Sequence, residues 1–128
     1  MRFATLLGAL LVVGALLGFV PLLLSPGAEI HPLAVDTPHD QLFGLFPVNA
    51  ADNIVHGALG LWGLAAARSE RAATGFARAM TAVFAALTLG GFVPAAGDLI
   101  PLYGNDIWLH GLLALAAGWF GWLHRIAA

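Results

Sequence analysis

The sequence predicts an all-α protein: a bundle of four transmembrane helices built from two homologous helical hairpins. Three observations lead to this prediction. Of the 128 residues, 60% are hydrophobic and only 9% are charged, whereas about a quarter of the residues in an ordinary soluble domain are charged. The basic residues lie near the two ends of the chain and where the second apolar stretch gives way to the third, and one motif occurs twice. A chain of this length holds about four spans of ~20 residues each, so we expect a single integral membrane domain over residues 1–128.

The duplicated motif divides the chain into two equivalent hairpins. Leu45-Phe46-Pro47-Val48, followed by Asp52 and His56, matches Leu99-Ile100-Pro101-Leu102, followed by Asp106 and His110, with a constant offset of 54 (106 − 52). Further upstream, Gly18-Phe19-Val20-Pro21 matches Gly91-Phe92-Val93-Pro94 with an offset of 73 (91 − 18). We therefore predict that residues 3–67 and 76–123 form two homologous hairpins.

The first helix is predicted from Phe3 to Leu24, a stretch without ionisable residues that ends at Ser25-Pro26-Gly27. A cleaved signal peptide is the alternative, because Arg2 precedes the apolar run. The run is longer than the apolar core of a usual signal peptide, so we expect a helix that is retained. The next segment, Glu29 to Asn49, is rich in proline, acids and histidine. We expect an external loop there, with its apolar end, 42–46, at the bilayer surface or folded back onto the bundle.

The other three helices are predicted from their apolar stretches and flanking polar residues. Their expected ranges are Asp52 to Ala67, Phe76 to Pro94 and Asp106 to Leu123. Arg78 is then expected in the first turn of the third helix, and Pro21 and Pro94 should bend or end the first and third helices. Small residues should let the helices approach closely: Gly14 and Gly18, the series Gly57, Gly60 and Gly63, and Ala114 with Gly118.

The basic residues predict the orientation in the membrane. All five lie at the N-terminus, between the second and third helices, or at the C-terminus: Arg2, Arg68, Arg71, Arg78 and Arg125. Six of the seven acidic residues fall on the opposite side. The positive-inside rule then places both termini in the cytoplasm of a multi-pass protein of the inner, or plasma, membrane.

The two Asp-x-x-x-His pairs are the candidate functional residues, because residues four apart share one face of a helix. In one interpretation Asp52 and Asp106 are helix N-caps and His56 and His110 have structural roles. In the other, the two histidines form a ligand site near the outer surface: they bind haem axially, or hold a divalent metal ion together with Asp52 or Asp106. Zinc would need a further ligand, which His31 or His39 could supply; His124 is expected at the cytoplasmic interface.

Other chemistry finds little support in the sequence. There is no Gly-rich phosphate loop, no nucleophile elbow and no basic surface for nucleic acid. The chain has no cysteine, which excludes disulfides and thiolate metal sites. We expect a protein that is not an enzyme and does not bind nucleic acid.

The motifs resemble those of a bacterial family of small four-helix membrane proteins known as domain of unknown function 4383. The segments that carry the resemblance are Leu42 to Asn49, Asp52-Asn53-Ile54-Val55-His56, Gly60-x-x-Gly63-Leu64, Ala67-Arg68, and Pro101 through Asp106-Ile107-Trp108-Leu109-His110. Ile107 stands where the family often has asparagine, which argues against a polar role at that position. The resemblance implies the fold and a membrane location, and it implies no reaction.

From these observations we expect a structural or accessory subunit that lies in the lipid bilayer. Its partner would be a second copy of itself or a larger membrane complex, because a small bundle rich in glycine and aromatic residues suits such packing. The alternative function is a metal- or haem-binding membrane module that uses His56 and His110.

Overall fold

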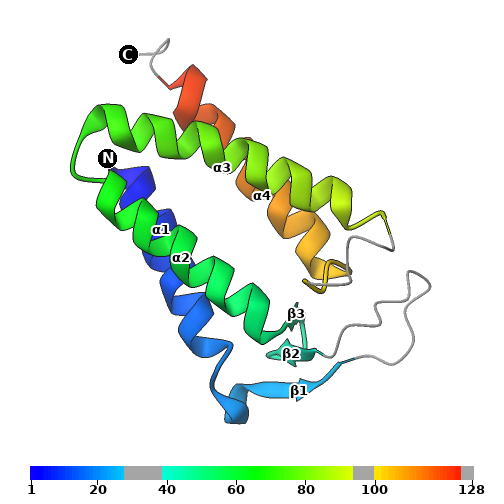
Figure 1. Cartoon of the computed structure of the whole chain (residues 1–128). Helices are drawn as coiled ribbons and strands as arrows, with labels where there is room; N and C mark the ends of the chain where they lie inside the picture. Colours follow the sequence, from blue (N-terminus) through cyan, green and yellow to red (C-terminus); the bar gives the residue numbers. More distant parts are fainter. Residues whose placement is uncertain (28–38, 94–99, 125–128) are drawn as a thin grey trace.

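The computed structural model describes residues 1–27, 39–93 and 100–124 (Figure 1). These residues are mostly helical, which confirms the all-α prediction at that level. The helices are α1 (Arg2–Leu17), α2 (Ala50–Ala66), α3 (Glu70–Gly90) and α4 (Asn105–Gly118). A 3-10 turn, η1 (Pro21–Leu23), follows α1, and a π-helical segment, η3 (Trp119–Leu123), extends α4. Three short strands, β1 (Leu24–Pro26), β2 (Asp40–Leu42) and β3 (Phe46–Val48), form one sheet.

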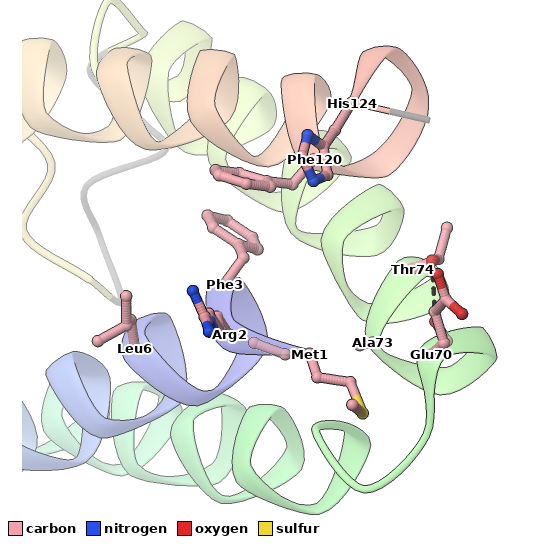
Figure 2. Close-up of a pocket in the computed structure, with 10 residues that line it drawn as sticks. Met1, Arg2, Phe3, Leu6, Glu70, Ala73, Thr74, Phe120 and His124 are labelled. Carbon is pink, nitrogen blue, oxygen red and sulfur yellow. Dashed lines mark hydrogen bonds between the residues drawn. The ribbon is translucent and has the colours of Figure 1, made fainter. Parts of the chain in front are cut away.

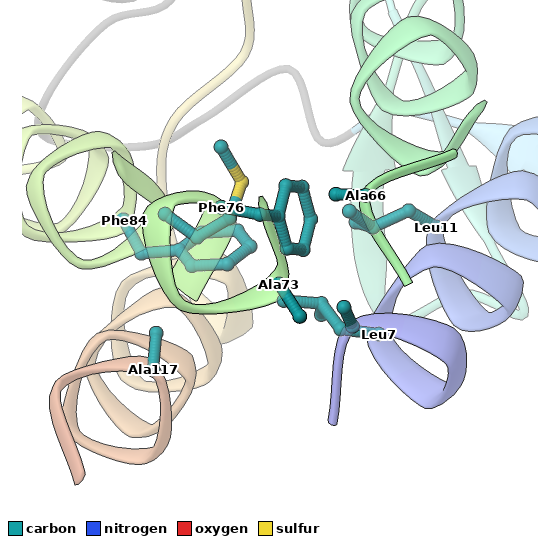
Figure 3. Packing of buried hydrophobic residues seen from close by; sticks show 9 residues of the cluster. Leu7, Leu11, Ala66, Ala73, Phe76, Phe84 and Ala117 are labelled. Atoms are coloured by element: carbon teal, nitrogen blue, oxygen red, sulfur yellow. The ribbon is translucent and has the colours of Figure 1, made fainter. Parts of the chain in front are cut away.

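The helices pack as two pairs, α1 with α2 and α3 with α4 (Figure 1). The pairs meet through α3, whose buried side chains Phe76, Met80 and Phe84 form the centre of the hydrophobic core (Figure 3). Leu7 and Leu11 of α1 reach this core from one side and Ala117 of α4 from the other. The first turn of α1 also contacts η3, because the rings of Phe3 and Phe120 stack with centroids 4.7 Å apart (Figure 2).

Close approach of α1 and α2 depends on glycine at two positions. A Cβ atom at Gly60 would lie 2.7 Å from the backbone nitrogen of Val12, and one at Gly8 would lie 2.8 Å from the carbonyl oxygen of Gly60. The predicted role of Gly60 in packing is therefore correct, but Gly14 was the wrong choice on α1. No atom lies within 4 Å of a Cβ built at Gly14, because Gly14 faces away from the α1–α2 contact.

The contacts within the two helix pairs correspond to each other. A Cβ atom at Gly57 would lie 3.7 Å from Ala15 Cβ, and one at Gly111 would lie 3.7 Å from Thr88 Cγ2. These residues are related by the same offsets, 54 (111 − 57) and 73 (88 − 15), as the duplicated motifs. Pro47 and Pro101, a further matched pair, are both fully buried. Equivalent residues thus occupy equivalent positions in the two pairs.

The first helix is shorter than predicted, and the segment after it contains a sheet. α1 ends at Leu17 and not at Leu24 because Pro21 starts a 3-10 turn. Strand β1 then pairs antiparallel with β2, Leu24 opposite Leu42, and β2 pairs antiparallel with β3. The last part of the predicted loop, Glu29 to Asn49, therefore contains a β-hairpin, which was not predicted from the sequence.

Two other helix boundaries differ from the prediction. α3 begins at Glu70, six positions before the predicted Phe76, because the side chain of Ser69 accepts a hydrogen bond from Ala72 N and caps the helix. Arg78 consequently lies in the third turn of α3, where its Nε donates to the carbonyl oxygen of Gly121 at 2.8 Å. Its guanidinium also lies 5.4 Å from the ring centroid of Trp122. At the other end, α3 stops at Gly90, and Pro94 lies outside the described residues.

Within the described part of the chain, α3 is the one helix that is both long and apolar enough to cross a membrane. α1 is similarly apolar but has 16 residues, which extend over ~24 Å at ~1.5 Å per residue. The sequence predicted four spans, but among the described residues one helix meets the length and composition needed to cross a membrane.

Candidate functional site

A cavity of about 340 Å³ lies between α1, the β2–β3 hairpin, and the first turns of α2 and α4. Its wall is mostly apolar and includes Leu10, Leu11, Val13, Leu17, Leu42, Phe43, Phe46, Pro47, Val48, Leu109 and Leu113. Its polar residues are Asp52, Asn53, His56, Asp106 and His110. The structure therefore brings both Asp-x-x-x-His pairs to one cavity.

The first pair is hydrogen-bonded. His56 Nδ1 lies 3.1 Å from Asp52 Oδ2, one turn apart on α2. Asp52 is buried, while the side chain of His56 is 25% exposed. The bond to Asp52 fixes the orientation of the imidazole ring and leaves Nε2 as the atom available to a ligand.

The second pair differs from the first in its contacts. No hydrogen bond joins Asp106 to His110 among the described residues, although they share one face of α4. His110 stacks on Phe84 of α3, with ring centroids 5.8 Å apart, and is only 3% exposed. Its Nδ1 is buried without a hydrogen-bond partner in the described part of the chain. The duplicated histidines therefore have unlike surroundings.

Neither aspartate is a helix cap, which corrects the structural interpretation. Asn49 caps α2, and its Oδ1 accepts a hydrogen bond from Asp52 N at 2.8 Å. Gly104 occupies the cap position of α4 with φ 61° and ψ −126°, a conformation that a residue with a side chain rarely adopts. Asp52 and Asp106 instead lie in the first turns of their helices, where a carboxylate interacts favourably with the helix dipole.

Of the other histidines, the structure describes His39 and His124, and neither lines this cavity. His39 Nε2 lies 2.6 Å from the hydroxyl of Tyr103, which also accepts a hydrogen bond from Gln41 Nε2. His31 lies outside the described residues. His124 is at the other end of the molecule, beside Phe120 (Figure 2). Among the described residues, no three side chains of histidine, aspartate or glutamate come together as a metal site.

Asn53 is a cavity residue that the sequence analysis did not select. It is buried, and its Nδ2 donates to the carbonyl oxygen of Gly18 at 2.8 Å. At the equivalent place in the second pair, the side chain of Ile107 lies against Gly91. The sequence did contain a signal for Asn53: it directly follows Asp52 in the first copy of the motif, whereas isoleucine follows Asp106 in the second copy.

Comparison with known proteins gives one match. The chain fits the sequence model of a family described as Domain of unknown function (DUF4383) over residues 1–123. Neither the curated proteins nor the solved structures include a significant match. Since the match covers nearly the whole chain, this protein belongs to the DUF4383 family.

Proposed function

We propose that this protein is a multi-pass membrane protein that acts as a structural or accessory subunit, packed against copies of itself or a larger membrane complex. One observation carries the proposal: large apolar side chains cover the outside of the helices. Leu6 and Leu16 are exposed along α1, Ile54, Leu61 and Trp62 along α2, and Leu112, Leu115 and Trp119 along α4 and its extension. Exposed apolar surface of this extent is typical of contact with lipid or with another protein.

The proposed topology has four spans with both termini in the cytoplasm. It is supported by Arg2, Arg68 and Arg71 at one end of the helices and by the sheet with its acidic Asp40 at the other. α1 and α2 are short for a ~30 Å hydrocarbon core, but the apolar residues Phe19 and Val20 continue beyond α1 and are exposed.

Cysteine labelling tests the topology cleanly, because the natural chain has no cysteine. The exposed residues Asp40 and Ala72 lie at opposite ends of the helices. In intact cells, a membrane-impermeant maleimide should label Asp40→Cys and leave Ala72→Cys unlabelled until the membrane is opened. Labelling of Ala72→Cys in intact cells, or equal labelling of both, would contradict the proposed orientation. The unsubstituted chain, which has no cysteine to label, is the negative control.

The accessory role is tested by photo-crosslinking in native membranes. A photoreactive residue at Leu115, which is 74% exposed on α4, or at Leu6, which is 71% exposed on α1, samples two outer faces. We expect a discrete adduct from at least one of these positions. An adduct of twice the 13.3 kDa chain mass would indicate a second copy, and a larger one a different subunit. Absence of protein adducts from both faces would contradict the role.

The second candidate function is a metal- or haem-binding module. It is supported by His56 and His110 on one cavity, with His56 oriented by Asp52. Haem requires only two axial imidazoles, whereas a structural zinc ion would require more ligands. Visible absorbance and elemental analysis of protein isolated from native membranes without chelator distinguish these cases. A colourless preparation without stoichiometric metal would rule out this function.

A further inference from the structure

We propose that the cavity between α1, the β2–β3 hairpin, α2 and α4 binds an amphiphilic organic cation. In this arrangement the ammonium head lies at Asp106, near the Asp52–His56 pair, and the hydrocarbon tail lies along α1. The proposal concerns the cavity itself and does not rest on the membrane topology or on the accessory role.

The polar end of the cavity is only partly hydrogen-bonded by the described residues. Asp106 is only 7% exposed, yet its carboxyl group has no hydrogen-bond partner among the described residues. His110 is 3% exposed, and its Nδ1 is buried without a partner in the same part of the chain. A buried carboxylate or imidazole costs free energy unless a hydrogen bond or an opposite charge compensates for lost hydration. Both residues line the cavity, so a bound molecule can supply that compensation.

The charge of the cavity wall favours a cation. The ionisable residues of the wall are two aspartates and two histidines, without an arginine or lysine. Asp52 is already paired with His56, so the carboxyl group left for a head group is that of Asp106. A phosphate, sulfate or carboxylate head group would be repelled by this carboxylate, whereas an ammonium group would be attracted to it and would favour its charged form. The exposed ring of Phe43 and the ring of Phe46 also line the cavity, and aromatic faces attract ammonium groups.

The rest of the cavity wall favours an organic cation over a metal ion. No three of the possible metal-binding side chains gather at one point among the described residues, so a bare metal ion would not be well coordinated. The larger part of the wall is hydrocarbon, formed by side chains such as Leu10, Val13 and Leu113. The volume of about 340 Å³ lies at the lower end of the usual range for small-molecule sites, roughly 300–1,000 Å³.

Native mass spectrometry of the full chain in a non-ionic detergent tests the proposal with three probes that share one tail. These probes are dodecylamine, dodecanol and dodecyl sulfate. We expect one dodecylamine molecule per chain, and binding of the other two weaker by at least about tenfold, the usual effect of losing a charge-assisted hydrogen bond. Equal binding of all three probes, or no binding of the amine, would overturn the proposal. So would a preparation that already contains haem or stoichiometric metal.

Two pairs of variants locate the site. Asp106→Asn should weaken dodecylamine binding at least about tenfold, and Asp40→Asn, an exposed carboxylate on β2 outside the cavity, should not change it. Gly14 lines the cavity with open space around its Cβ position, so Gly14→Leu should fill the tail site and abolish binding. Gly75 has equal space but lies away from the cavity, which makes Gly75→Leu the matched control. Unchanged binding in both Asp106→Asn and Gly14→Leu would refute the assignment.

Discussion

At the scale of single residues, matched positions of the two motif copies lie in equivalent places but can carry different chemical groups. Asn53 and Ile107 follow the two matched aspartates, and each lies against the glycine that ends the preceding helix. Asn53 donates a hydrogen bond to the carbonyl oxygen of Gly18, which Ile107 cannot do for Gly91. At this position a buried hydrogen bond therefore joins α1 to α2, and an apolar contact joins α3 to α4.

This difference predicts that Asn53 contributes to stability through its amide group. Asn53→Ala removes the donor and leaves the buried carbonyl of Gly18 unpaired, so we expect a loss of ~1–3 kcal/mol in the free energy of unfolding. The measurement is a denaturation titration in detergent. Ile54→Ala is the neighbouring control, because Ile54 is 64% exposed and should change stability by ~0.5 kcal/mol or less. A larger effect at Ile54 than at Asn53 would contradict the role of the buried bond.

At the scale of elements, the starts of α2 and α3 are set by polar side chains that directly precede them. Asn49 accepts from Asp52 N at the start of α2, and Ser69 accepts from Ala72 N at the start of α3. Each side chain satisfies a backbone donor that the first turn of a helix leaves free.

We expect Asn49→Ala to destabilise the protein by ~0.5–2 kcal/mol, the usual cost of a lost N-cap. Asn49→Ser should retain most of the stability, because a hydroxyl also caps well. Both are measured by thermal unfolding at one detergent concentration. Equal losses for the two variants would show that Asn49 acts through something other than its cap.

The contact between α1 and α2 leads to a prediction about glycine. Gly60→Ala places a methyl group 2.7 Å from the backbone nitrogen of Val12, so the helices must separate, at a cost of ~1–3 kcal/mol. Gly75→Ala in α3 meets no atom within 4 Å and should stabilise the protein by up to ~1 kcal/mol, because alanine favours helix. Unfolding titrations of the two variants should therefore shift in opposite directions. A neutral Gly60→Ala would show that the helices are not in close contact.

At the scale of the whole molecule, polar contacts join the sheet to the second helix pair. The hydroxyl of Tyr103, just before α4, accepts from Gln41 Nε2 at 3.2 Å and lies 2.6 Å from His39 Nε2. Nearby, Asn105 Nδ2 donates to the carbonyl oxygen of Leu45 at 3.0 Å. These bonds hold the cavity wall formed by the β2–β3 hairpin against α4.

Tyr103→Phe should loosen that connection without disturbing the helix pairs. We expect faster hydrogen exchange in the peptide that covers β2 and β3, and unchanged exchange in α1 and α2, because only the hydroxyl contacts are lost. Mass spectrometry of exchanged peptides measures both regions in one sample. Uniformly faster exchange across the chain would show a global loss of stability, and unchanged exchange in β2 would show that the hydroxyl does not hold the hairpin.

The sequence alone determined the helical class, the order of the helices and the duplicated Asp-x-x-x-His pairs, because these follow from composition and short-range spacing. It also indicated the family, through motifs around Asp52 and Asp106. Tertiary structure decided the rest. In the sheet, Leu24 lies opposite Leu42. Strands of three residues are too short for alternating polar and apolar residues to reveal this pairing in the sequence. His56 and His110 differ because Phe84 covers only the second. Gly8, and not Gly14, meets α2 because helix rotation is fixed by packing, and the same rotation leaves Gly14 facing the cavity.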